Sequence, residues 1–94
     1  MKYLMLCANR HDIPEAIDGS IFPATVNPLD IEGMDNYAER MLTAMQVDAL
    51  TLYVTGLTVA VVTVINICRR KRIPLILMHY DRDNDTYYKQ VVET

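Results

Sequence analysis

Three short polar segments hold most of the side chains in this chain that are suited to bind or react with a small molecule. They read Asn9-Arg10-His11-Asp12, Thr55-Gly56-Leu57-Thr58 and His79-Tyr80-Asp81-Arg82, and each follows an apolar run. Histidine transfers protons near neutral pH, arginine binds phosphate through paired hydrogen bonds, and glycine lets a ligand approach the backbone. These residue types indicate a site for a small anionic ligand, with acid–base chemistry available.

The apolar runs before these segments predict the strands of a parallel sheet. Tyr3 to Ala8, Leu50 to Val54 and Leu75 to Met78 lack the alternation that is typical of strands with one exposed face. The carboxyl ends of parallel strands meet at one edge of a sheet, and open α/β sheets bind their ligands there. We therefore expect the three polar segments to form one site at that edge.

Two helical patterns separate the predicted strands. Apolar residues from Met34 to Met45 have the spacing of an amphipathic helix, with Asp35 as the expected N-cap and Asp48 at its end. Thr58 is the expected N-cap of a second helix, Val59 to Arg70, which is apolar around most of its circumference. A second copy of the chain is the expected cover for its second side, and packing under the N-terminal arm is the alternative.

The remaining segments predict an arm and two edge strands. Residues 13–33 contain three prolines and two glycines and predict an irregular arm. Ser20 to Phe22 or Ala24 to Val26 fits only an edge strand, because Pro23 and Pro28 cannot donate to a sheet. Tyr87 to Val92 predicts a C-terminal edge strand. Residues 1–94 therefore predict a single α/β domain, small, Rossmann-like and three-layered, with a mainly parallel sheet.

The composition argues against several classes of protein. The net charge of −3 disfavours general nucleic-acid binding. We expect no cofactor or metal, because Walker A, GxGxxG and Cys/His zinc spacings are absent. The acidic turn at residues 81–85 also lacks the glycine and glutamate of a calcium loop. No signal peptide or membrane span is expected, so we expect a cytoplasmic protein with buried thiols at Cys7 and Cys68.

The predicted site combines phosphate binding with proton transfer. The turn from Thr55 to Thr58 offers hydroxyls, a glycine and the N-terminus of a helix to a phosphate group. The alternative for each residue is structural: a turn at Gly56, a cap at Thr58, ion pairs for the arginines and packing for Tyr80. The expected ligand-binding residues are Asn9, Arg10, Thr55, Gly56, Thr58, Tyr80 and Arg82, and the expected catalytic residues are His11 and His79.

The later half of the chain resembles that of CARF-like domains, the Rossmann-like domains associated with CRISPR systems. The similar residues are Leu50 to Thr58, the long apolar helix, and Ile73 to Leu77, while Asn9-Arg10-His11 is similar to the family's first ligand loop. Leu57 stands where many of these domains have the second glycine of a Thr-Gly-Gly-Thr turn. The resemblance implies a homodimer that binds cyclic oligoadenylate across its two-fold axis, and in some members opens that ring without a metal.

A different class of function remains open. The chain is then a non-enzymatic interaction or accessory protein of a mobile element or phage. In that case the apolar second helix is used for assembly with other protein chains, and the polar residues after the strands are ordinary solvent-exposed loop residues.

Overall fold

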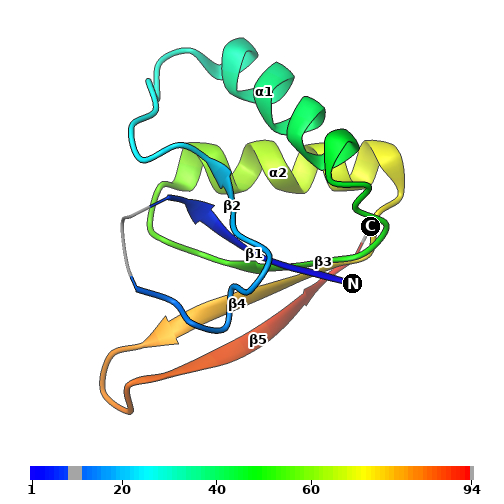
Figure 1. Cartoon of the computed structure of the whole chain (residues 1–94). Helices are drawn as coiled ribbons and strands as arrows, with labels where there is room; N and C mark the ends of the chain where they lie inside the picture. Colours follow the sequence, from blue (N-terminus) through cyan, green and yellow to red (C-terminus); the bar gives the residue numbers. More distant parts are fainter. Residues whose placement is uncertain (9–11, 94) are drawn as a thin grey trace.

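The computed structural model describes residues 1–8 and 12–93 and shows a mixed α/β fold with a five-stranded sheet and two helices (Figure 1). Along the chain the elements are β1 (Lys2–Cys7), β2 (Ser20–Phe22), α1 (Ile31–Ala44), β3 (Leu50–Tyr53), α2 (Thr58–Lys71), β4 (Leu75–Asp81) and β5 (Thr86–Val92). The α/β class predicted from the sequence is confirmed.

The sheet has the strand order β2-β1-β3-β4-β5. The first four strands are parallel, and β5 is antiparallel to β4. This confirms the mainly parallel sheet and the C-terminal edge strand. The short strand β2 lies within the arm at the opposite edge, and Pro23 follows it directly.

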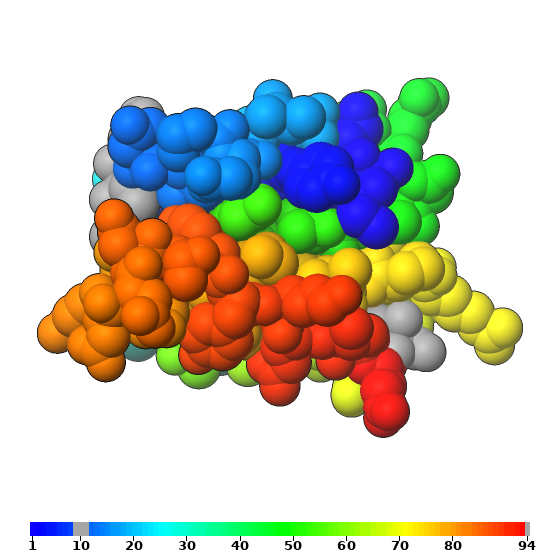
Figure 2. Space-filling model, turned by 90° about the horizontal axis from the view of Figure 1, so that it is seen from below, coloured from blue at the N-terminus to red at the C-terminus, as the bar shows by residue number. Residues whose placement is uncertain are grey.

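Both helices cover the same face of the sheet, so the structure has two layers where the sequence predicted three (Figure 1). The strand order explains this difference. The chain crosses from β2 past β1 to β3 through α1, and then from β3 to β4 through α2 in the same direction. Right-handed crossovers taken in one direction place their helices on one face. The connection from β1 to β2 steps the other way, and its residues 12–19 lie over the second face (Figure 2).

Alternate strand residues divide between the two faces, as the strand period of two requires. The side chains beneath the helices are leucines, and each is at least 95% buried. They are Leu4, Leu6, Leu50, Leu52, Leu75 and Leu77. We call the other side of the sheet the open face. There Tyr53 packs with Ile13 and Ala16 of the arm in a second, smaller cluster.

The N-cap of α1 is Asp30 rather than the predicted Asp35. Its Oδ1 accepts a hydrogen bond from the backbone N–H of Gly33 at 3.0 Å. Asp35 lies inside the helix instead and pairs with Arg70 of α2 at 2.9 Å. The helix ends at Ala44, before the predicted Asp48. Sequence periodicity located the helix, whereas its start was set by a local aspartate outside the periodic segment.

The start of α2 also differs from the prediction, because Thr58 is its first residue and not its cap. Leu57 is the N-cap, and no side chain within residues 1–8 and 12–93 caps this end. α1 packs along α2, so a helix of the same chain covers the side for which a second copy or the N-terminal arm was expected. Val62 is the only large hydrophobic residue of α2 that is exposed. Among the described helices, none has the length and apolar character needed to span a membrane.

Candidate functional site

A cleft of about 790 Å³ lies on the open face at the carboxyl ends of β3 and β4. Its walls come from three parts of the chain: the arm, the turn after β3, and the hairpin of β4 and β5. In Figure 2 the arm (blue) and the hairpin (orange) meet at this end of the molecule. The cleft thus lies at the strand edge where the sequence predicts a ligand site.

Three tyrosines from three adjacent strands form the aromatic part of the cleft. Tyr53, Tyr80 and Tyr87 come from β3, β4 and β5. The ring centroids of Tyr53 and Tyr87 are 5.1 Å apart with planes nearly perpendicular, and those of Tyr80 and Tyr87 are 5.5 Å apart. Tyr80 and Tyr87 are paired in the strand register, and so are Tyr53 and Met78. Strand pairing therefore positions this aromatic surface.

The same cleft is acidic. Carboxylates of Asp12, Glu15 and Asp85 line it, and no lysine, arginine or histidine does so within the described part of the chain. Burial, followed by the negative charge of Glu15, raises the pKa of both Tyr53 and Tyr87. The lining therefore favours a ligand group that donates hydrogen bonds or carries positive charge.

The turn after β3 supplies a hydroxyl and a bare stretch of backbone. Thr55 is 8% exposed, and its Oγ1 has no hydrogen-bond partner among the described residues. Gly56 has a φ of +82°, where other residues are strained, and a Cβ there would meet open space. Both residues line the cleft just before the uncapped end of α2. This turn therefore offers a bound molecule a hydroxyl that no described residue engages.

The hydrogen bond from the Tyr80 hydroxyl to Oδ1 of Asp85 is 2.6 Å long and spans the β4–β5 turn. It raises the pKa of Tyr80 and keeps the phenol protonated. In that state Tyr80 has no free proton to donate, because its hydrogen is already engaged. In the cleft Tyr80 therefore offers its aromatic ring rather than an acidic proton.

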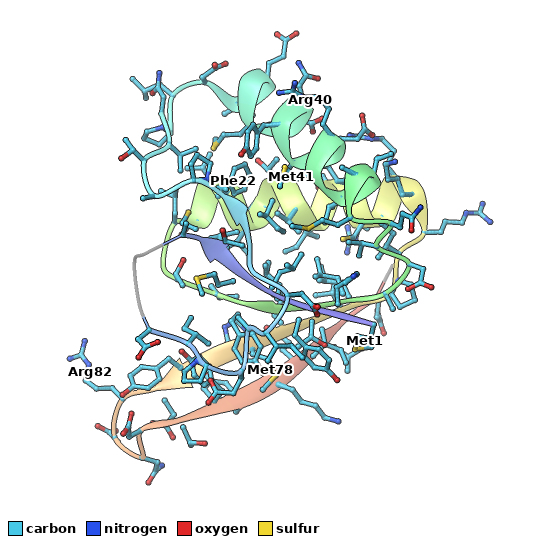
Figure 3. The ribbon with its side chains drawn as sticks, in the orientation of Figure 1. Met1, Phe22, Arg40, Met41, Met78 and Arg82 are labelled. Atoms are coloured by element: carbon cyan, nitrogen blue, oxygen red, sulfur yellow. The ribbon has the colours of Figure 1, made fainter. Side chains whose placement is uncertain are left out.

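Three of the sequence-predicted site residues lie away from the cleft lining. Arg82 is exposed in the β4–β5 turn, and its side chain points away from the molecule (Figure 3). Thr58 is exposed at the start of α2. His79 was predicted in a loop but lies within β4, on the helix side of the sheet. There its Nε2 is 2.8 Å from Oε1 of Gln90, and Tyr88 is its ring neighbour.

Three further predicted residues, Asn9, Arg10 and His11, lie outside the described residues. The structure brings together Thr55, Gly56 and Tyr80 from the predicted set. Their shared position follows from the parallel strands, as the sequence argument required.

Sequence reasoning missed most of the cleft lining. Tyr53, Tyr87 and Glu15 were not proposed, because only residues after strand ends were considered. The strand period of two was a signal that could have found Tyr87. Side chains two residues apart share a face, so Tyr80 and Met78 point the same way, and the edge strand places Tyr87 beside them. Asp85 was dismissed with its acidic turn. No group of His, Cys, Asp and Glu suited to a metal occurs within residues 1–8 and 12–93.

Comparisons with models of protein families, with curated proteins and with solved structures give no match to this chain. The resemblance to CARF-like domains therefore rests on its sequence motifs. What the structure adds is the composition of the cleft: tyrosines and carboxylates, together with a threonine hydroxyl that has no partner among the described residues and a neighbouring glycine turn.

Proposed function

We propose that this protein binds a nucleotide in the cleft at the ends of β3 and β4. The observation that carries the proposal is the Thr55 hydroxyl, which is buried in the cleft wall without a partner among the described residues. Folded proteins pair nearly all such groups, because leaving one unpaired costs about 1–3 kcal/mol. A ligand atom in the cleft would supply that partner.

The aromatic end of the cleft suits the base of the nucleotide. Tyrosine rings stack on bases, and each such contact contributes about 1–3 kcal/mol. The carboxylates of Glu15 and Asp12 accept hydrogen bonds, and adenine presents an amino group that donates them. Ribose hydroxyls are donors of the same kind. An adenine nucleoside therefore matches the aromatic and acidic character of this lining.

The phosphate would lie beside Gly56. The backbone is accessible there, and α2 begins without a side-chain cap, so its first N–H groups and dipole favour an anion. The acidic residues would repel a phosphate placed among them. The nucleotide would therefore bind with its base at the tyrosines and its phosphate at Gly56. The proposed ligand is the cyclic oligoadenylate of CARF-like domains, and the proposed scaffold is a Rossmann-like domain.

The proposal concerns binding and not ring opening. His79, one of the two histidines expected to assist cleavage, lies on the opposite side of β4 from the cleft. Tyr80 is held as a donor to Asp85. Neither residue is positioned to take a proton from a ligand in the cleft.

A second candidate ligand is an organic cation, such as a methylated amine. It is favoured by the lining itself, which combines three tyrosines with the carboxylates of Asp12, Glu15 and Asp85. Aromatic faces attract quaternary ammonium groups, and nearby carboxylates add to that attraction. A cation would leave the Gly56 turn unoccupied, whereas a nucleotide would use it.

The test is a two-dimensional NMR titration of the ¹⁵N-labelled protein with adenosine monophosphate, cyclic tetra-adenylate and tetramethylammonium. Tyr80→Ala and Tyr88→Ala form a matched pair, because both side chains are about half exposed but only Tyr80 lines the cleft. For a nucleotide we expect shifts at Thr55 and Gly56 and at least a fivefold loss of affinity in Tyr80→Ala, with no loss in Tyr88→Ala.

Each other outcome rejects the proposal. Shifts with tetramethylammonium alone, weakened by Glu15→Gln, would replace the nucleotide with an organic cation. Binding that Tyr88→Ala weakens as much as Tyr80→Ala would place the ligand elsewhere. No shift with any of the three compounds would favour the non-enzymatic interaction protein.

A further inference from the structure

The two edges of the sheet differ in how well they are protected against pairing with another chain. β2 is three residues long and is followed by Pro23, which cannot donate to a ladder. β5 spans seven residues without a proline, and no strand in the described part of the chain pairs with its outer side. A long unprotected edge is a template for strand addition.

We infer that β5 is the interface of a homodimer, in which two copies pair antiparallel around a two-fold axis at Val91. The five-stranded sheets of the two copies would then form one continuous sheet. Both helices lie over the strands from β1 to β4, so the outer side of β5 is free of them. This interface is independent of the cleft and of the proposed nucleotide.

The charges on the edge select this register. With the axis at Val91, Lys89 faces Glu93 of the partner subunit, and the symmetry makes this pair twice. Neither Lys89 nor Glu93 has an ion-pair partner among the described residues. Opposite charges directly across an antiparallel pair stabilise it.

The fully overlapping register is disfavoured by the same residues. An axis at Lys89 would place the two lysines opposite each other and would set Glu93 opposite Asp85 of the partner subunit. Both contacts are repulsive. Axes at Tyr88 or Gln90 leave Lys89 opposite an uncharged residue. An axis at Tyr87 would set Lys89 opposite Asp85, but Asp85 lies in the β4–β5 turn with a φ of +48° and accepts the Tyr80 hydrogen bond. Of these registers, the axis at Val91 therefore pairs Lys89 with an opposite charge outside the turn.

The apolar surface of the open face supports the same register. Val91 is 64% exposed and is paired with Ile76, which continues a row through Thr51 to Tyr3. With the axis at Val91, this row would meet the same row of the partner at the two valines. The most exposed apolar side chain of β5 would thereby be covered on its outer side.

The first experiment introduces cysteines on the edge. Val91→Cys should form a disulfide-linked dimer in a mild redox buffer, because facing residues bring their Cα atoms within disulfide range. Lys89→Cys is the matched control on the same strand and face, and it should not link, since its two copies would be about 13 Å apart. The native Cys7 and Cys68 are buried.

The second experiment exchanges the charges and follows the dimer by analytical ultracentrifugation over a range of concentrations. Lys89→Glu should raise the dissociation constant at least tenfold, and Lys89→Glu with Glu93→Lys should restore the original value. Circular dichroism would confirm that each variant is folded.

The inference is overturned if the protein is monomeric throughout, or if the double exchange does not restore dimerisation. Cross-linking through Lys89→Cys instead of Val91→Cys would show the fully overlapping register and would also overturn it. Pairing of β5 with a strand from a different protein, with no dimer present, would contradict the inference as well.

Discussion

Tyr80 and Asp85 are joined by a 2.6 Å hydrogen bond at the rim of the cleft, with the phenol as donor. The bond raises the pKa of Tyr80 above its usual value. Ultraviolet titration of tyrosine ionisation should therefore show late-ionising groups, one of which is lost in Tyr80→Phe. Asp85→Asn should bring its pKa down. An unchanged titration in Asp85→Asn would contradict the contact, and Tyr88→Phe controls for the loss of one tyrosine signal.

The raised pKa values of Tyr53, Tyr80 and Tyr87 predict how stability changes in alkaline solution. In each case the folded state retains a proton that the unfolded chain loses above about pH 10. Stability is therefore full below that pH and falls as the pH rises through it. Urea denaturation between about pH 8 and pH 11 measures this. Tyr87→Phe should reduce the decline, and an equal decline in that variant would reject the explanation.

Replacing Thr55 with valine should stabilise the ligand-free protein. The change removes a buried hydroxyl that has no partner among the described residues, with little change in shape, and should raise the free energy of unfolding by about 1 kcal/mol. Thr63→Val is the control, because Thr63 Oγ1 donates to the Val59 carbonyl at 2.8 Å. That variant should be neutral or less stable by up to about 1 kcal/mol. A destabilised Thr55→Val protein would show that the hydroxyl has a partner.

The cap of α1 predicts that the effect of Gly33→Ala on stability depends on whether Asp30 is present. A Cβ on Gly33 would clash with the carboxylate of Asp30, so Gly33→Ala should not stabilise the natural chain, although alanine is the better helix former. Asp30→Ala should cost about 1 kcal/mol by itself. In that background Gly33→Ala should gain about 1 kcal/mol. Thermal unfolding of the four proteins measures the coupling, and additive effects would contradict it.

The thiol of Cys68 should be unreactive in the folded protein. Its side chain is buried in α2, and burial raises its pKa to about 11. Because the thiolate is the reactive form, labelling by a thiol reagent at neutral pH should be at least tenfold slower than in the unfolded chain. The measurement is mass spectrometry of labelled peptides over time. Equal rates in the two states would show that this part of α2 is accessible.

The sequence predicted the elements of this fold better than their arrangement. Apolar runs located β1, β3 and β4, and the apolar spacing located both helices. The prediction of three layers was wrong, because the number of layers depends on the direction in which each crossover steps along the sheet. That direction follows from the strand order, which a local sequence pattern does not reveal. The predicted start of α1 was wrong because its cap, Asp30, lies outside the periodic part of the helix. The predicted end of β4 was wrong because pairing with β5 extends the strand to Asp81.

The candidate site was predicted in position and only in part in composition. Parallel strand ends meet wherever the sheet is formed, so Thr55, Gly56 and Tyr80 were found from the sequence. Tyr53 and Tyr87 were not found, because the face that they share with Tyr80 depends on the register between strands. Glu15 reaches the site through the path of the arm, which a segment rich in proline and glycine does not reveal.

The arm has a further consequence for how the cleft is filled. Its residues 12–17 are held on the open face by the small cluster of Ile13 and Ala16 against Tyr53, whereas β2 and the helices share the main core. Detaching these residues therefore costs a fraction of global unfolding, and their amides should exchange with solvent water earlier than those of β3. A ligand that contacts both the arm and the strands would raise the free energy needed to detach the arm. Affinity in the cleft is thus linked to the local folding equilibrium of one wall.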